Sequence, residues 1–347
     1  MSTNDMSTMD RRNFLRGAAG FGALAGAFPP SAWAADTLHL LSWGWGYDKS
    51  IKDGIAPRLT GASIQLEVGT NAANYAKLVA QRANPIISGG TFNGTFSYRG
   101  HGDKLWTKLD KSSIPNAANV PDYAYLETNG VVFGVQPYGI VYNPRYAEKP
   151  KSYLDLFDPK YKGKVGLSDY IFDGFGLTAK AMGKSIDDVP GGIAAWAQHK
   201  ANIGPWNQSP AQTHDLVEAG ELWLAFGFGG ISAGAIAAGK KIAVTIPSEG
   251  ATQVADVAHA IAGFNDKTTA LTMRALGLFF DDAAQLAFTR NVFTSPISKS
   301  AKIPADLAAN PALLSPEQVG ALLRPDLELS AKKFGEYKNL ANQQLKS

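Results

Sequence analysis

Two tryptophans and a tyrosine, Trp43, Trp45 and Tyr47, alternate with glycines in the stretch LSWGWGYDKS, directly after an apolar run. Glycine permits backbone dihedral angles that other residues avoid, so this stretch is a poor interior for a helix or a strand. The face of a tryptophan or tyrosine ring attracts a desolvated cation by about 2 kcal/mol. A buried ammonium group also needs a carboxylate, because an unpaired charge is too costly to bury. The stretch therefore favours a site for a cationic solute, with acids supplied from elsewhere in the chain.

A second pattern, GISAG at residues 230–234, fits the G-x-S-x-G turn of serine hydrolases, in which Ser232 is the nucleophile. Asp256 and His259 follow it in the acid and base order of that fold. An acid and a base so close in sequence cannot come from the ends of separate strands, however, and no HGGG-type oxyanion loop lies upstream. A serine hydrolase is thus kept only as an alternative, and we expect no enzymatic activity.

The composition is that of a well-buried globular protein. The length of 347 residues is enough for one large or two ordinary domains. With 45% hydrophobic and only 18% charged residues, the chain can bury a large core. The net charge is +3 and the lysines are dispersed, so no basic face for a nucleic acid is expected. The chain has no cysteine, and its five histidines have no ligand-like spacing. Thiolate catalysis is therefore excluded, and neither a metal nor another cofactor is expected.

The first 34 residues have the pattern of an export signal. Arg11 and Arg12 precede an apolar run rich in glycine and alanine that is too short to span a bilayer, and residues 32–34 read AWA, a cleavage site of the A-x-A kind. The arginine pair followed by Asn-Phe-Leu resembles a twin-arginine signal. We expect residues 1–34 to be removed and the mature chain to lie in the bacterial periplasm.

The elements that position these side chains begin as alternating strands and helices. Strands are predicted at residues 37–41 and 63–70, each followed by a helix, and Asn71 or Asn74 is the expected cap of the second helix. This order predicts a mostly parallel sheet with helices on its faces. In such sheets ligands bind outside the carboxyl ends of the strands, which is where Trp43 lies.

Further along the chain the patterns are mixed. Residues 85–102 are rich in Gly, Ser and Thr and are predicted to form a loop, whereas residues 130–143 read as a buried extended segment that is interrupted at Pro137 and crosses between two lobes. A long amphipathic pattern covers residues 265–291, and Ser315 is a good helix start. The chain is expected to leave a first α/β unit, build a second and return.

Residues 150–169, PKSYLDLFDPKYKGKVGLSD, closely resemble the segment P-x-S-W-x-D-L-x-D-P-x-Y-K-G-K-V of the periplasmic solute-binding proteins of ABC importers, in the group of the spermidine/putrescine-binding proteins (extracellular solute-binding family 1). Shorter matches to the same family occur in the family's order along the chain, at 40–47, 109–116, 138–144, 219–230 and 246–256. The resemblance implies a type II binding-protein fold: two α/β lobes, each a mostly parallel sheet flanked by helices, with the ligand cleft between them. Lobe 1 would comprise residues 35–137 and 250–300, lobe 2 residues 138–249, and the helices of 301–347 would pack across both.

The family's polyamine-binding residues carry over in part. Trp43 matches the aromatic residue after the first strand, and Asp169 and Asp173 lie where two acids hold an amino group, although Tyr170 takes the place of one acid. Phe228 and Val254 replace two of the family's tryptophans, while the acid two residues after Val254 is kept as Asp256. The expected ligand-binding residues are Trp43, Trp45, Tyr47, Tyr98, Tyr138, Asp169, Asp173, Phe228 and Asp256.

The function implied by the resemblance is capture of a small amine-bearing solute, such as putrescine or spermidine, and its delivery to an ABC permease with its ATPase subunits. The replaced tryptophans leave a shorter zwitterion, such as γ-aminobutyrate, as the alternative solute. In that case Arg99 would be the first candidate to clamp the carboxylate. The protein is expected to be a monomer without cofactor.

Overall fold

The computed structural model describes residues 36–44, 46–168 and 170–346. The expected export signal and two of the expected site residues, Trp45 and Asp169, lie outside these ranges. The strands are β1 (Asp36–Ser42), β2 (Ala62–Val68), β3 (Gly89–Asn93), β4 (Tyr125–Leu126), β5 (Gly130–Tyr142), β6 (Val165–Gly166), β7 (Leu224–Phe228), β8 (Ala243–Thr245) and β9 (Thr252–Ala260). The α-helices are α1 (Gly46–Gly54), α2 (Asn71–Ala80), α3 (Gly94–Gly102), α4 (Asp173–Ala181), α5 (Val189–Gln198), α6 (Pro210–Ala219), α7 (Gly229–Ala237), α8 (Asp266–Leu278), α9 (Asp282–Val292), α10 (Pro316–Gly320) and α11 (Leu327–Leu345).

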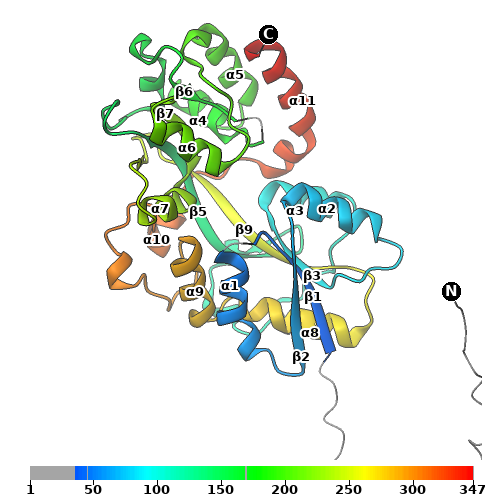
Figure 1. The fold of residues 1–347 in the computed structure, drawn as a ribbon. Coiled ribbons are helices and arrows are strands. Elements are labelled where there is room, and N and C mark those ends of the chain that lie inside the picture. The colour runs from blue at the N-terminus through cyan, green and yellow to red at the C-terminus, as the bar shows by residue number, and fades with distance from the viewer. Residues whose placement is uncertain (1–35, 45, 169, 347) are drawn as a thin grey trace, which may run out of the picture. The chain divides into compact units, whose positions relative to one another are not determined.

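The described strands form one sheet with the main order β2-β1-β3-β9-β5-β7-β6, and β4 and β8 pair with β5. The pairs at its two ends are parallel, β1 with β2 and β3, and β6 with β7. The long strands β5 and β9 run antiparallel to each other and join the two ends (Figure 1). The predicted α/β alternation is therefore confirmed, with two antiparallel strands at the centre.

Strand β5 is buried along its whole length. It passes through Pro137, whose register partner on β9 is Gln253, so the predicted interruption at Pro137 is wrong. The proline ring fixes φ near a value that an extended chain tolerates, and only the N–H is lost. The strand instead has an irregularity between Val132 and Gly134.

Residues 85–102 are predicted to form a loop, but only the first four belong to the connection after α2, and the rest form β3 and α3. The glycines are needed for close strand packing: a Cβ at Gly89 would lie 2.8 Å from Leu40 Cδ2, and one at Gly90 would lie 2.8 Å from Leu41 Cβ. Asn93 then starts α3, because its side chain accepts a hydrogen bond from the amide of Phe96. Glycine is needed here for strand packing, although in a sequence it usually indicates a turn.

The cap of α2 also differs from the expectation. Thr70 accepts from the Ala73 amide and is the N-cap, so neither asparagine has that role. Asn71 is free to accept from Trp43 Nε1 and from the amide of Asn93, both at 3.1 Å. The amphipathic pattern of 265–291 is divided between α8 and α9, whereas the predicted helix start at Ser315 is confirmed as a capping box with Gln318.

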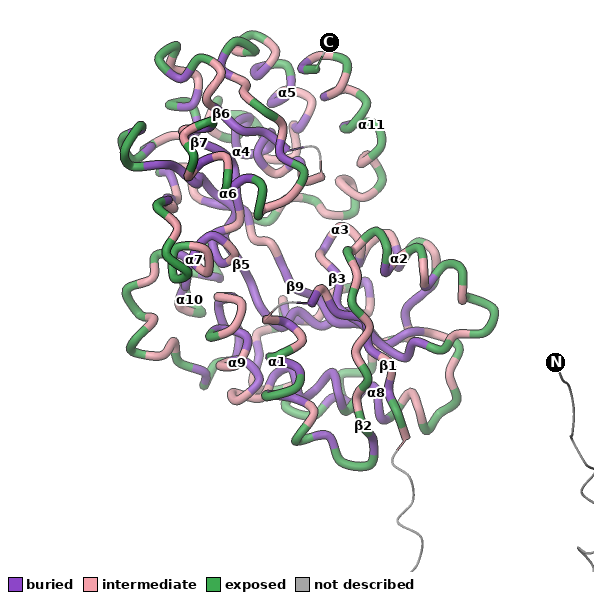
Figure 2. The backbone as a smooth tube through the Cα atoms, viewed as in Figure 1, coloured by how far each residue is buried: buried purple, intermediate pink, exposed green. Residues whose placement is uncertain are grey.

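Two large clusters of buried side chains flank the point where β5 crosses between them. Val131 to Val135 pack in the first cluster, with β1, α1, α8 and α9, and we call these elements lobe 1 together with β2, β3, α2 and α3. Tyr138, Ile140 and Tyr142 pack in the second cluster, with β7, α4 and α5, and we call these elements lobe 2 together with β6 and α6. Figure 2 shows β5 buried between the lobes, whereas the start of β9 is in part of intermediate burial. No helix among the described residues has the length and apolarity to cross a membrane.

Candidate functional site

A pocket with a volume of about 60 Å³ lies where both lobes meet the start of β9. Its wall in lobe 1 is residues 93–96, its wall in lobe 2 includes residues 170–173, and residues 252–255 of β9 and part of α11 complete it. A buried water needs about 10–15 Å³ in this measure, so the pocket holds about four to six water-sized groups. We call it the interlobe pocket, and its size suits a short, slim solute.

Asp173 projects from lobe 2 at the first residue of α4, where the helix dipole favours a negative charge. Its Oδ2 accepts a hydrogen bond of 2.6 Å from the hydroxyl of Thr252, on β9. Burial raises the pKa of the Asp173 carboxyl above its ordinary value. The carboxyl group therefore lies in poorly hydrated surroundings, in which a nearby cation would stabilise its charged form.

The charged side chains that line the described part of the pocket are all acidic. Asp173 and Asp187 line it, whereas no lysine, arginine or histidine is among the described lining residues. Asp187 Oδ1 accepts from the amide of Asp326 at 2.7 Å. The lining rings are those of Phe96, Tyr170, Phe172 and Phe334. Acids combined with rings suit ammonium groups on a hydrocarbon chain, and the described part of the pocket offers no base to hold a carboxylate.

A second group of rings and an acid forms around Asp256. The Tyr47 hydroxyl donates to Asp256 Oδ2 at 2.9 Å, and the rings of Tyr47 and Trp43 meet edge to face with centroids 4.7 Å apart. Thr294 Oγ1 donates to the same carboxylate oxygen at 3.3 Å, and Gln136 Nε2 donates to the Tyr47 hydroxyl at 3.1 Å. Trp43, Tyr47 and Asp256, distant in sequence, are thus brought together as one cluster.

Burial raises the pKa of Asp256 from 3.8 to about 7, against the opposing effect of its hydrogen bonds. The side chain is 3% exposed, and neither Tyr47, Gln136 nor Thr294 carries a positive charge. The usual compensation for a buried carboxylate, a nearby cation, is absent from these partners. The site is therefore suited to receive a cation.

Strand geometry relates this cluster to the interlobe pocket. Val254 lines the pocket, and Asp256 follows two residues later on the same strand, so their side chains share one face of the sheet. The register partner of Asp256 on β3 is Asn93, which also lines the pocket. Asp256, Tyr47 and Trp43 do not themselves line the pocket, but the strand neighbours and the register partner of Asp256 do.

The other expected site residues lie in different surroundings. Tyr138 is buried and faces Phe228 across the β5–β7 ladder, with ring centroids 5.0 Å apart. Tyr98 and Arg99 line a separate groove of about 320 Å³ between α3 and α11, where the Tyr98 hydroxyl donates to Glu127 at 2.9 Å. The Arg99 guanidinium lies over the ring of Phe96, 4.9 Å from its centroid, and does not line the interlobe pocket.

The constellation required for the hydrolase alternative does not form. Ser232 is fully buried within α7, and its Oγ is 2.9 Å from Nε2 of His214 on α6. His259 instead bonds to Ser97 Oγ at 2.8 Å, and Asp256 bonds to Tyr47. The predicted grouping of Ser232 with Asp256 and His259 is therefore wrong, since the strand places Asp256 and His259 on opposite faces.

Phenylmethylsulfonyl fluoride is expected to leave Ser232 unmodified, because the side chain has no exposed surface. Intact-mass measurement should show no sulfonyl adduct in the folded protein. An adduct that peptide mapping assigns to Ser232 would restore the hydrolase hypothesis.

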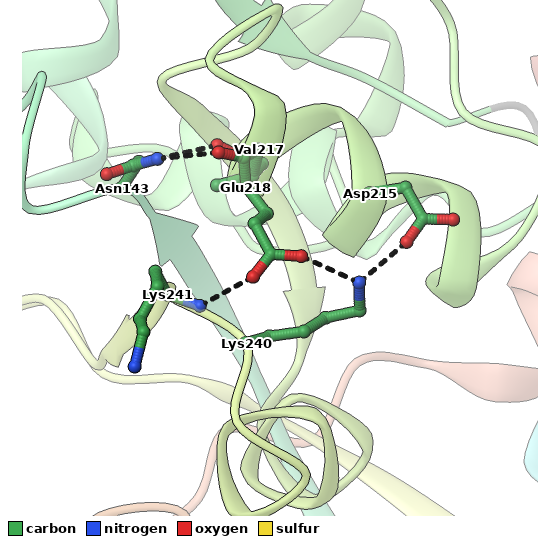
Figure 3. A network of polar contacts seen from close by, with 6 residues as sticks. All are labelled: Asn143, Asp215, Val217, Glu218, Lys240 and Lys241. Atoms are coloured by element: carbon green, nitrogen blue, oxygen red, sulfur yellow. Dashed lines mark hydrogen bonds and ion pairs between the residues drawn. The ribbon is translucent and has the colours of Figure 1, made fainter.

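The polar contacts next to this pair have a structural role. Lys240 donates to Asp215 Oδ1 at 2.8 Å and to Glu218 Oε2 at 2.9 Å, while the Lys241 amide donates to Glu218 Oε1 (Figure 3). Asn143 donates to the last carbonyls of α6 from the end of β5. These contacts fasten α6 to the chain that leads into β8, and none of the residues lines the interlobe pocket.

Several pocket residues carried no signal that the sequence patterns could isolate. Asn93 lies in the glycine-rich segment predicted as a loop, and Thr252 and Asp187 are single polar residues without a motif. The α11 residues were covered only by the expectation that terminal helices pack across the lobes. Their spacing, Leu327, Ser330 and Phe334, is that of one helix face and is the signal that could have identified them.

Solved structures share this fold. The spermidine/putrescine ABC transporter substrate-binding protein PotD from Streptococcus pneumoniae has a TM-score of 0.72 at 19% identity, covering 89% of this chain and 98% of its own. The Atu4243 GABA receptor gives 0.74 at 20% identity, with the same coverages of 89% and 98%. The protein AgtB from A. tumefaciens R10, in complex with agropinic acid, gives 0.70 at 17% identity, covering 90% of this chain and 99% of its own. The two-lobed α/β binding-protein fold is thereby confirmed.

The sequence itself gives the family. No curated protein is matched by this chain at a significant level. The family model described as bacterial extracellular solute-binding protein matches residues 64–315, which include most of β2, both crossing strands and the long motif at 150–169. This chain belongs to the bacterial extracellular solute-binding proteins.

Proposed function

We propose that the solute is a small linear amine with at least two ammonium groups, such as putrescine or spermidine. The observation that carries the proposal is the lining of the interlobe pocket, which combines the carboxylates of Asp173 and Asp187 with aromatic rings and has no basic residue among its described members. Carboxylates balance the ammonium charges, and rings contact the methylene chain and the cation faces. The family's PotD is named as a spermidine/putrescine-binding protein.

Asp173 in the pocket and Asp256 next to it on β9 suggest how such a solute lies. One ammonium group binds at Asp173, with Tyr170 and Phe172 beside it. Another binds at the cluster of Trp43, Tyr47 and Asp256, whose carboxylate is hydrogen-bonded to no cation among the described residues. Trp45 and Asp169 are proposed as further contributors to the cleft, whereas Tyr98, Tyr138 and Phe228 do not line the interlobe pocket.

A zwitterion such as γ-aminobutyrate is the second candidate. It is favoured by the likeness to the GABA receptor, and the groove at Arg99 offers a base close to the ring of Phe96. The interlobe pocket itself has no described base for a carboxylate, so the diamine is preferred.

The remaining assignments follow the family role. The protein delivers its solute to an ABC permease, and we place it in the periplasm, exported through a twin-arginine signal at residues 1–34 and acting as a monomer. Lobe 1 comprises residues 35–137 and 250–300, lobe 2 residues 138–249, and residues 301–347 pack across both. Catalysis has no part in this role.

A thermal-shift screen of the mature protein tests the solute class. Diamines, triamines, ω-amino acids and opine-like acids are compared at equal concentration and pH 8. A solute at 100 times its Kd adds about 2.7 kcal/mol to the free energy of unfolding, which shifts the melting temperature measurably. Stabilisation by ω-amino acids and not by diamines would select the zwitterion, and no response to any amine would end the proposal.

Asp173→Asn is expected to weaken diamine binding by about 10- to 100-fold, because a hydrogen bond to a charged group contributes about 1.5–3 kcal/mol. Isothermal titration with putrescine measures the change. Thr252→Val is the matched control, since it removes the hydroxyl that donates to Asp173 and keeps the charge. Equal losses in the two variants would show that packing at this position, not the carboxylate, determines affinity.

A further inference from the structure

Helix α11 is anchored in lobe 2. Tyr337, Ala341 and Leu345 are buried in the second core cluster, and the ring of Phe334 meets that of Phe172 edge to face with centroids 5.2 Å apart. Contacts with α5 lie along the helix, as Figure 1 also shows. The helix is therefore expected to move with lobe 2.

The chain that leads into α11 forms a third connection beside the crossing strands. Leu323 exchanges backbone hydrogen bonds with β9: the Gln253 amide donates to its carbonyl at 2.8 Å, and its own amide donates to the Ala251 carbonyl at 3.0 Å. Arg324 Nε donates to the Gln253 side chain at 2.7 Å. The start of α11 is thus fixed to the strand that carries the pocket residues 252–255.

The first turns of α11 reach the wall that lobe 1 contributes. A Cβ placed on Gly94, the first residue of α3, would lie only 2.5 Å from Leu327 Cδ1, so the two helices touch at this point. Leu327, Ser330 and Phe334 all line the interlobe pocket. They follow one another at spacings of three and four, on one helix face that continues into the buried residues Tyr337 and Ala341.

We propose that α11 is a wall of the solute pocket that limits solute length, with Ser330 and Phe334 as the residues that set the limit. The proposal rests on the proposed function. The helix spans from its anchor in lobe 2 to α3 of lobe 1 and covers the pocket between them. A larger side chain on its inner face takes space from the far end of the solute, whereas the carboxylates that bind the ammonium groups are unchanged.

The test compares Ser330→Leu with Asn339→Leu, a change to the same residue at an exposed position of the same helix. Titrations with putrescine, cadaverine and spermidine are made on wild type and both variants. Ser330→Leu should weaken binding at least tenfold, with a loss that increases with solute length, and Asn339→Leu should leave all affinities within twofold. Phe334→Ala supplies the opposite change and should favour the longest solute.

A second measurement does not depend on affinity. The chain has no cysteine, so Ser330→Cys and Asn339→Cys each carry one thiol for maleimide labelling. Saturating putrescine should slow labelling of the Ser330→Cys variant at least fivefold and leave the Asn339→Cys variant unchanged.

The two proposals fail in different ways. If wild type binds no amine, the proposed function falls and this inference falls with it. If wild type binds amines while Ser330→Leu and Phe334→Ala keep its order of affinities, or putrescine leaves labelling at position 330 unchanged, the role of α11 alone is overturned.

Discussion

Amine affinity is expected to fall about tenfold for each pH unit below pH 7 and to be constant above it. In the solute-free protein, burial raises the pKa of Asp256 to about 7, so the carboxyl holds a proton in more acidic solution. An ammonium group binds the carboxylate form, and binding below pH 7 must therefore release that proton. The solute itself stays charged, because alkylammonium groups titrate near the lysine value of about 10.4. Calorimetric titration with putrescine at pH 5, 6, 7 and 8, at constant ionic strength, measures the slope.

Asp256→Asn should remove this slope and weaken binding at pH 8 by at least about 100-fold, since breaking a buried charge pair costs about 3–5 kcal/mol. Asp122→Asn is the control, because Asp122 is a fully exposed acid whose loss should leave both affinity and slope unchanged. The groups that face Asp256 are Tyr47 from α1, Gln136 from β5 and Thr294 after α9. None of them titrates between pH 5 and 8, so a slope that survives in Asp256→Asn would assign the proton to another acid and contradict the proposed anchor.

The alternation of strands and helices was predictable because it depends on local periodicity. The hydrogen bond between Tyr47 and Asp256 joins residues 209 positions apart. It does not follow from local periodicity, because it depends on β9 lying next to β3 in the sheet. Periodicity alone cannot supply that neighbourhood, and only the resemblance of the motifs 40–47 and 246–256 to a known family predicts both residues in one site. The motifs thus carried information on tertiary structure that residue patterns lacked.

The errors have a common physical origin in tertiary packing. Gly89 and Gly90 were read as loop residues, but they are small because β3 packs closely on Leu40 and Leu41. Pro137 was read as a break, although β5 continues through it. In each case a neighbour far along the chain determines the conformation, and the local preference is overruled.

The pocket walls show the same limit. Asp187 lines the pocket beside the start of α11, held by its hydrogen bond to the Asp326 amide, and Ser330 lines it because α11 docks on lobe 2. Neither residue has a distinctive type or spacing on its own. Their role depends on how segments more than 100 positions apart pack together, which the docking of whole helices decides.

The same carboxylate that is proposed to bind the solute should also destabilise the empty protein. Asp256→Asn is expected to reveal this, because the order of stability of wild type and variant should reverse between low and high pH. Folding raises the pKa of Asp256 from 3.8 to about 7, so the folded state holds this proton more tightly than the unfolded state. The resulting stability is fully present below pH 3.8, is lost as pH rises through 7, and amounts to about 4 kcal/mol, because each pKa unit is worth about 1.4 kcal/mol.

Asparagine at position 256 does not titrate, but one of its amide protons has no certain acceptor among Tyr47, Thr294 and Gln136, at a cost of about 1–3 kcal/mol. Wild type should therefore be the more stable protein at pH 4 and Asp256→Asn the more stable one at pH 8, by about 1–3 kcal/mol, in urea unfolding without solute. Asp122→Asn should follow wild type at both values. Parallel pH profiles for wild type and Asp256→Asn would mean that the carboxylate is not strained in the empty site. If the profiles cross and wild type binds amines more tightly at pH 8, the buried charge serves solute binding although it lowers the stability of the fold.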